Sequence, residues 1–188
     1  MQRSGRDSRK GAGDRLAAAR RAVARAIELL SSKDLFCVWS GKRLTEKSLD
    51  IDHCFPWSAW ACDDLWNLMP ADRRVNQHQK RDRLVAALRV AARGGRLARY
   101  ASAVARCDRL PGAEILRSAQ ERVQSWWDEA YIQTANSLIP RRFVTEARAS
   151  LPGLLYSADT LALDDLFAAV MLQRAKLKHD QQVPEWSG

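Results

Sequence analysis

The chain has 188 residues, a length that suits one domain of ordinary size or a small domain with a helical extension. Apolar residues make up 46% and charged residues 28%, the balance of a soluble folded protein. No apolar run reaches the roughly 18 residues needed to cross a bilayer, and no secretory signal pattern follows Met1, so we expect a cytoplasmic protein.

Positive charge is concentrated in one part of the chain. The net charge of +9 comes from 31 basic and 22 acidic residues. Residues 72–99 hold nine basic and two acidic side chains, whereas residues 111–188 hold eight basic and ten acidic ones. A local basic segment attracts a polyanion through phosphate neutralisation and counterion release, so nucleic acid is the first partner to consider. A solvated helix face is the alternative that charge alone leaves open.

The beginning of the chain predicts a tail, a helix and two short strands. Residues 1–13 are polar and lack periodic apolar positions, so we expect a disordered basic tail. Residues 14–30 place apolar side chains at helical spacing. Residues 35–39 and 48–53 favour extended structure, with a Ser-Gly turn signal between them.

A loop and several helices are expected after the second strand. Residues 54–66 form a loop with three of the seven tryptophans. Asp72 is placed to cap a helix that runs to the glycine pair at residues 94 and 95. Two further helical patterns occupy residues 114–139, closed by Pro140, and residues 158–178. The sequence therefore predicts a predominantly helical α+β fold.

Four polar side chains, Asp52, His53, Asn67 and Asn76, are suited to cutting a phosphodiester. Hydrolysis needs a base to deprotonate water, a Lewis acid to hold developing charge, and a group that orients the base. His53 can accept a proton at neutral pH, since an unperturbed imidazole has a pKa of about 6.5. Asp52 and the amide oxygen of Asn76 are hard oxygen donors of the kind that Mg²⁺ prefers.

These residues lie at a spacing that resembles the HNH motif of the ββα-metal endonucleases. A D-H pair at a strand end is followed by an Asn 14 residues after the His, another Asn nine residues later, and then Lys80. The stretches "DIDHCFPWS" and "DDLWNLMPADRRVN" are similar to the subgroup found in bacterial defence and mobile-element nucleases. The resemblance covers roughly residues 35–84, less than a third of the chain.

The resemblance implies a role for each residue of the motif. His53 would be the general base, Asp52 and Asn76 would hold the metal, and Asn67 would brace the loop and the His53 backbone. One carboxylate supports a single Mg²⁺ or Mn²⁺ better than a pair of ions. His78 lies two residues after Asn76, roughly 200° around a helix, so both cannot serve one ion.

The remaining polar and aromatic side chains near the motif are assigned to DNA contact or to packing. Trp57, Trp60 and Trp66 could stack on bases, but we interpret them as anchors that fold the loop over the core. Asp63 and Asp64 are interpreted as the close of a turn. The side chains expected to contact the nucleic-acid backbone are Lys80, Arg73, Arg74, Arg81 and Arg83.

No structural zinc is expected. Many relatives carry two C-x-x-C pairs that hold zinc, whereas here Cys37 is followed three residues later by Ser40 and no second pair follows. The four cysteines are therefore interpreted as reduced and partly buried thiols.

We therefore predict a metal-dependent HNH endonuclease that cleaves DNA, with its domain and a leading helix at residues 14–94. Residues 95–188 form a helical region whose role the sequence leaves open and whose surface could meet a protein partner. The alternative is a non-catalytic nucleic-acid-binding or assembly subunit of a defence complex that retains the ββα shell. The intact set of Asp52, His53 and Asn76 favours the enzyme, because a binding module has no need of it.

Overall fold

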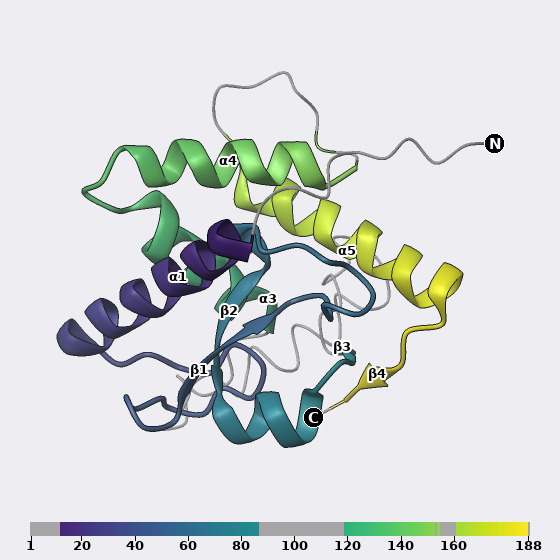
Figure 1. Ribbon diagram of the computed structural model, residues 1–188, viewed down its shortest axis with the longest axis horizontal. Coiled ribbons are helices and arrows are strands. Elements are labelled where there is room, and N and C mark those ends of the chain that lie inside the picture. The colour runs from purple at the N-terminus through teal and green to yellow at the C-terminus, as the bar shows by residue number, and fades with distance from the viewer. Residues whose placement is uncertain (1–11, 87–118, 153, 155–160, 188) are drawn as a thin grey trace, which may run out of the picture.

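The computed structural model describes residues 12–86, 119–152, 154 and 161–187. Helices dominate these residues and surround a small hairpin, which confirms the predicted α+β fold (Figure 1). The strands are β1 (Leu49–His53), β2 (Leu68–Asp72), β3 (Leu84–Val85) and β4 (Glu185–Trp186). The helical elements are α1 (Ala12–Ser32), η1 (Leu65–Asn67), η2 (Val75–Lys80), α3 (Ala119–Trp127), η4 (Asp128–Ile132), α4 (Leu138–Ser150) and α5 (Leu163–Gln181).

The strands β1 and β2 form an antiparallel hairpin that η2 follows, which gives a ββα arrangement. In the hairpin register His53 lies opposite Leu68, and Asp52 lies opposite Met69. Figure 1 shows the teal helix of η2 crossing the lower end of the hairpin. The order of elements therefore brings the end of β1 and the side chains of η2 into one region.

The two faces of β1 have different partners. Ile51 packs against Leu68 and against two buried alanines of α1, whose small side chains let the helix approach the hairpin closely. Successive residues of a strand point to opposite faces, so Asp50 and Asp52 lie on the other face. There both carboxylates contact side chains of η2. The apolar side of the strand thus packs on α1, and the polar side supplies Asp50 and Asp52 to the candidate site.

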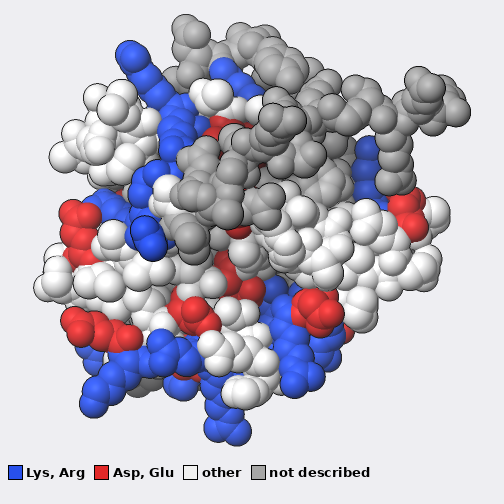
Figure 2. Space-filling model, in the orientation of Figure 1, with Lys and Arg blue, Asp and Glu red and all other residues white. Residues whose placement is uncertain are grey.

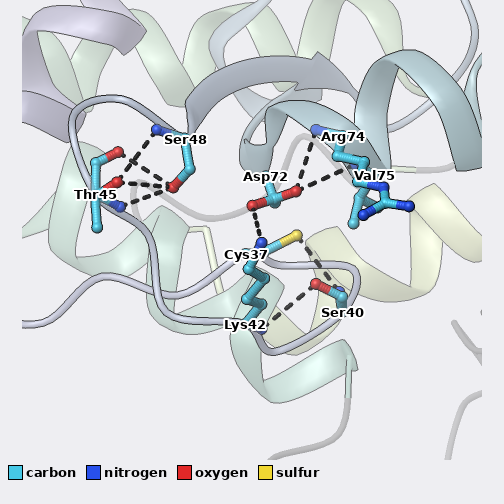
Figure 3. Close-up of polar contacts among 8 residues, drawn as sticks. All are labelled: Cys37, Ser40, Lys42, Thr45, Ser48, Asp72, Arg74 and Val75. Carbon is cyan, nitrogen blue, oxygen red and sulfur yellow. Dashed lines mark hydrogen bonds and ion pairs between the residues drawn. The ribbon is translucent and has the colours of Figure 1, made fainter.

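Asp72 caps the helix that follows β2, as predicted. Its Oδ1 accepts hydrogen bonds from the backbone N–H groups of Arg74 at 3.1 Å and Val75 at 3.3 Å. Its Oδ2 lies 2.8 Å from Lys42 Nζ (Figure 3). The Lys42 ammonium, helped by the two backbone donors, lowers the pKa of Asp72. The capping carboxylate is therefore favoured in its charged form in the folded protein.

A tight knuckle at residues 37–42 presents Lys42 to this carboxylate. The Cys37 N–H donates to Lys42 O at 2.7 Å, and the Gly41 N–H donates to Cys37 O at 2.8 Å. Gly41 has a φ of 71°, a left-handed conformation that glycine adopts without steric cost. Figure 3 shows two further contacts within the knuckle, from the Ser40 N–H to Cys37 Sγ and from the Lys42 N–H to Ser40 Oγ.

Replacing Asp72 with alanine should lower the free energy of unfolding by about 0.5–2 kcal/mol at neutral pH, because a helix cap is lost. Lys42 adds little, since 61% of its side chain is exposed. A carboxylate with a lowered pKa stabilises fully above its ordinary pKa of about 4, and this stabilisation is lost as the pH falls through its folded pKa.

Urea unfolding should therefore show the difference between the parent protein and Asp72→Ala shrinking as the pH falls from about 7 to about 3. Asp82→Ala, at an exposed aspartate, is the matched control and should stay close to the parent. A difference that does not change with pH would contradict the role given to the charged form.

Two predicted elements near the hairpin are shorter than expected. The strand predicted at residues 35–39 is a single bridge between Phe36 and Arg43, because the chain turns back at the knuckle. The helix predicted to run on to the glycine pair ends instead at Lys80, where Arg81 has a φ of 52°, outside the helical region. The part of that prediction beyond residue 86 lies outside the described residues.

Pro140 starts a helix rather than ending one, which corrects the prediction. It lies in the first turn of α4, where its missing N–H costs no helical hydrogen bond. The predicted helix at residues 114–139 thus divides into α3, η4 and the start of α4. The predicted last helix is confirmed by α5, which buries Phe167 and Val170. None of the described helices has the length and apolar character needed to cross a membrane.

The C-terminal helices pack on the hairpin and share its core. Trp126 Nε1 donates to Leu68 O at 2.8 Å, and Trp127 Nε1 donates to Trp66 O at 2.9 Å. Both rings are buried in this core. The start of β2 is therefore held by α3, although the predicted boundary between residues 94 and 95 lies outside the described residues.

The segment after α5 returns to the end of the ββα unit. β4 pairs in parallel with β3, and Arg174 Nε donates to Val85 O at 3.0 Å. Glu185 pairs with both Lys178 and Arg174, and these cations lower the pKa of its carboxyl. The chain that follows η2 is thus tied to β4 by backbone pairing and to α5 by the Arg174 hydrogen bond, and the charge pairs of Glu185 hold β4 on α5.

Candidate active site

His53 lies at the end of β1 with one ring nitrogen already engaged. Its Nε2 is 2.9 Å from Asp63 Oδ1, and 27% of its side chain is exposed. An ionised carboxylate only accepts hydrogen bonds, so the Nε2 atom carries the proton in the neutral ring. The lone pair then belongs to Nδ1, which is the nitrogen able to accept a proton.

Asp52 is buried and holds two donors on a single oxygen. Its Oδ2 accepts a hydrogen bond from Trp39 Nε1 at 2.7 Å and lies 3.0 Å from Lys80 Nζ. Burial raises the pKa of Asp52, and the Lys80 ammonium and the Trp39 N–H act against that rise. The Asp52 carboxylate is therefore paired with a buried cation, the Lys80 ammonium, rather than hydrated by solvent.

Lys80 lies inside the protein, not on its surface. Its side chain is 1% exposed, and Nζ donates to the carbonyl oxygen of His53 at 2.9 Å while it pairs with Asp52. The ammonium also lies 5.5 Å from the centroid of the Trp39 ring. The geometry thus differs from the expected phosphate contact, because the side chain points inward to Asp52 and the His53 carbonyl rather than outward to solvent.

The π-helical form of η2 sets this direction. The Arg81 N–H donates to Asn76 O at 2.9 Å, a bond across five residues that widens the turn. Lys80 lies at the end of this wide turn and reaches the end of β1. π-helical turns of this kind are frequent at functional sites.

Asn76 lies at the start of the same turn, on the Asp50 and Asp52 side of β1. Its Nδ2 donates to Asp50 Oδ2 at 3.1 Å, and Gln77 Nε2 donates to the same oxygen at 3.1 Å. The bond from Nδ2 fixes the amide plane, so the amide oxygen of Asn76 is directed away from Asp50. Asp50 therefore orients Asn76 from the neighbouring strand.

Asn67 is fully buried and joins the two ends of the loop that follows β1. Its Oδ1 accepts from the Phe55 N–H at 3.0 Å, and its Nδ2 donates to Cys62 O at 2.8 Å. Its backbone carbonyl accepts from the Cys54 N–H at 2.7 Å. The side chain touches the loop directly after His53 and thus restrains where that residue lies.

The order of strand, loop, strand and helix, with His53 and Asp52 at the strand end, is the arrangement expected from the sequence resemblance. Residues 37–86 match the HNH endonuclease family. The match covers about a quarter of the chain, and it contains every residue of the candidate site described above. No curated protein and no solved structure gives a significant match to the chain.

The HNH segment, residues 37–86, offers oxygen donors that suit a hard divalent cation. The carboxylate of Asp52 and the amide oxygen of Asn76 are of this type. Within the described residues, no three His, Cys, Asp or Glu side chains gather at a metal position. An ion here would therefore depend on one carboxylate, the amide and water, a combination that Mg²⁺ accepts because it keeps several of its waters.

The arginines predicted to contact DNA flank η2 in the HNH segment. Arg73, Arg74 and Arg81 are exposed, whereas Arg83 is half-buried and donates to Lys80 O at 3.2 Å. Figure 2 shows basic side chains spread along the lower edge of the molecule, where Figure 1 places η2. His78 is also exposed on this turn.

The three tryptophans of the loop divide into buried and exposed residues. Trp66 is fully buried, and Trp60 is half-buried with its ring edge-on to Phe55, as expected for anchors. Trp57 differs, because 40% of it is exposed and its ring centroid lies 5.7 Å from that of His53. The anchor interpretation therefore fails for Trp57.

Cys54 and Cys62, near the site, carry neutral thiols. Burial raises the pKa of the Cys54 thiol to about 12 and that of the Cys62 thiol to about 12. A neutral thiol is a poor nucleophile and a poor metal ligand. Cys37, Cys54 and Cys62 are free, and Cys107 lies outside the described residues.

Three residues of the site were not predicted from the sequence. Asp50 lies two residues before Asp52, and strand alternation alone could have placed it on the same face. Asp63 contacts His53 only because the loop folds back, and Trp39 reaches Asp52 from the knuckle. Sequence spacing carries no signal for the last two contacts.

Proposed function

We propose that the protein is a metal-dependent endonuclease that hydrolyses phosphodiester bonds of DNA, with His53 as the general base. The observation that carries the proposal is the pair formed by His53 and Asp63, with His53 directly after Asp52 at the end of β1. The support for the proposal is chemical. His53 is a base with a fixed tautomer, and Asp52, the residue before it, is a carboxylate that can serve a cation. The family of residues 37–86 agrees with a nuclease.

In this proposal His53 accepts the proton of the attacking water at Nδ1. Asp63 positions the ring through Nε2 and stabilises the imidazolium that forms, since a carboxylate favours the charged partner. Lys80 holds the backbone of the same residue through its carbonyl oxygen. Asp63 therefore holds the His53 ring and Lys80 holds the His53 main chain before any substrate binds.

Asp52 and Asn76 would hold the metal, with Asp50 as the group that orients the amide. A bound Mg²⁺ or Mn²⁺ would supply Lewis-acid stabilisation of charge on the phosphate and on the leaving oxygen. The fixed amide plane of Asn76 keeps its oxygen available without rearrangement. Lys80 balances the charge of Asp52, so the carboxylate can stay ionised while buried.

A nucleic acid is the proposed substrate because the exposed arginines around η2 form a basic edge beside the site, and DNA is proposed because residues 37–86 match the HNH endonuclease family. Arg73, Arg74 and Arg81 can neutralise backbone phosphates, which makes binding strong at low salt and weaker as salt rises. Lys80 is not part of this surface. The basic edge would bind the DNA strand, while His53 and Asp52 at the end of β1 would take part in hydrolysis.

The direct test is plasmid cleavage by the purified full chain with Mg²⁺ or Mn²⁺, stopped by EDTA. Metal-dependent nicking that co-purifies with the protein and is absent from a His53→Ala preparation supports the proposal. DNA that is bound but stays intact with both metals would instead identify a binding module that retains the ββα arrangement.

Replacing Asn76 with alanine should raise the Mg²⁺ concentration needed for half-maximal nicking by about 10-fold or more, because a metal contact is removed. The matched control is Gln77→Ala, at the next residue, which donates to the same oxygen of Asp50. This control should leave the Mg²⁺ titration close to that of the parent. Equal shifts in the two variants would assign the effect to Asp50 and remove Asn76 as a ligand.

A further inference from the structure

Trp57 lies at the tip of a turn in the loop after β1. The N–H groups of Ala59 and Trp60 both donate to Pro56 O, at 3.0 and 2.9 Å, and this closes a turn with Trp57 on its outer side. Every tryptophan of the chain is among the described residues, and Trp57 is the most exposed of them. A large aromatic surface is thus presented to solvent.

The loop that carries Trp57 is held firmly. Cys54, Phe55 and Pro56 are buried, and Phe55 packs edge-on against Trp66 with ring centroids 5.6 Å apart. Asn67 bonds the loop near both ends. The exposed ring therefore has a fixed place, so its exposure is built into the fold.

That place is beside the proposed base. The centroids of the Trp57 and His53 rings are 5.7 Å apart, and the rings are tilted by 59°. One nucleotide of a stacked strand rises about 3.4 Å, so the separation of the two rings is less than two nucleotide steps. An aromatic face at this distance can meet a base that flanks the cleaved bond.

We propose that Trp57 is a stacking platform for a nucleobase beside the scissile phosphate, and that the preferred substrate presents this base unstacked in single-stranded DNA. The inference rests on the proposed nuclease function. In a duplex both faces of a base are covered by its neighbours, so a protein ring can stack only on a base that has left the stack. Aromatic platforms accept any base, because every base has a π-face.

The test uses a labelled single-stranded oligonucleotide, its duplex, and a series in which one nucleotide at a time is abasic. Binding is measured by fluorescence anisotropy in EDTA, and cutting is mapped with Mg²⁺. The parent protein is compared with Trp57→Leu, Trp57→Phe and Leu138→Ala. The last variant is the matched control, since Leu138 is an exposed apolar residue on α4.

We expect Trp57→Leu to weaken binding of the single strand by roughly 5- to 150-fold, the cost of losing one stacked base, and to leave duplex binding within about twofold. Trp57→Phe should keep most of the affinity, and Leu138→Ala all of it. In the parent, an abasic nucleotide at one position beside the cut should weaken binding to a similar extent. The same abasic nucleotide should cost Trp57→Leu nothing further.

Two results would overturn the inference without touching the nuclease proposal. One is a parent protein that cuts DNA but shows no sensitivity to any abasic position, a result that needs no variant to fold. The other is a Trp57→Leu protein that keeps the parental preference for the single strand. A parent that neither binds nor cuts any of these substrates would remove the proposed function, and this inference with it.

Discussion

Replacing His53 with alanine should lower the rate of Mg²⁺-dependent nicking by about 10²- to 10⁴-fold, the usual contribution of a general base. The reason is geometric. Nε2 is committed to Asp63 at 2.9 Å, so Nδ1 is the ring atom able to accept the proton from water. Alanine removes that atom and leaves the loop, the hairpin and the metal donors in place.

DNA binding should persist in the His53→Ala protein, because the exposed arginines around η2 are unchanged. The measurement is the initial rate of plasmid nicking at saturating protein, paired with a gel-shift of the same DNA in EDTA. His179→Ala is the matched control, since its ring is 89% exposed on α5, and it should cut at the parental rate. Parental cutting by His53→Ala would remove the assigned base.

The ββα core was predictable because it depends on short-range patterns. The extended pattern at residues 48–53 predicted β1. Asp72 was predicted to cap the next helix, and its carboxylate does so by accepting hydrogen bonds from two backbone N–H groups. The spacing between His53, Asn67 and Asn76 identified the family segment. These signals act over a few residues, so the sequence carries them directly.

The side-chain contacts of His53 and Asp52 were not predictable from the sequence, because they depend on how later segments of the chain fold back onto β1. Asp63 looked like a turn residue, and only the fold of the loop brings it to His53. Lys80 looked like a surface cation, and only the wide turn of η2 directs it inward. Long basic side chains have apolar stems that tolerate burial, so sequence alone does not separate the two placements.

The inward direction of Lys80 gives the buried Asp52 carboxylate a counter-charge. A buried carboxylate without a counter-charge would be protonated or would destabilise the fold. The Lys80 ammonium supplies that charge at 3.0 Å, and it also bonds the carbonyl of His53. One side chain thus links η2 to the last two residues of β1.

Replacing Lys80 with methionine should therefore lower the free energy of unfolding by about 3–5 kcal/mol, the cost of leaving a buried charge unpaired. Methionine keeps a similar shape, so the loss would reflect the charge and its hydrogen bonds rather than a cavity. Urea unfolding at neutral pH measures it. Lys42→Met is the matched control, because its pair with Asp72 is exposed on the lysine side and should cost about 1 kcal/mol or less.

The double variant Asp52→Asn with Lys80→Met separates pairing from packing. Removing the carboxylate charge should restore part of the lost stability, so the two changes should be non-additive by about 0.5–3 kcal/mol. The loss in Lys80→Met should also shrink as the pH falls, because burial raises the pKa of Asp52 and the protonated carboxyl needs no counter-charge. Strictly additive changes that do not depend on pH would show that Lys80 stabilises the fold by packing alone.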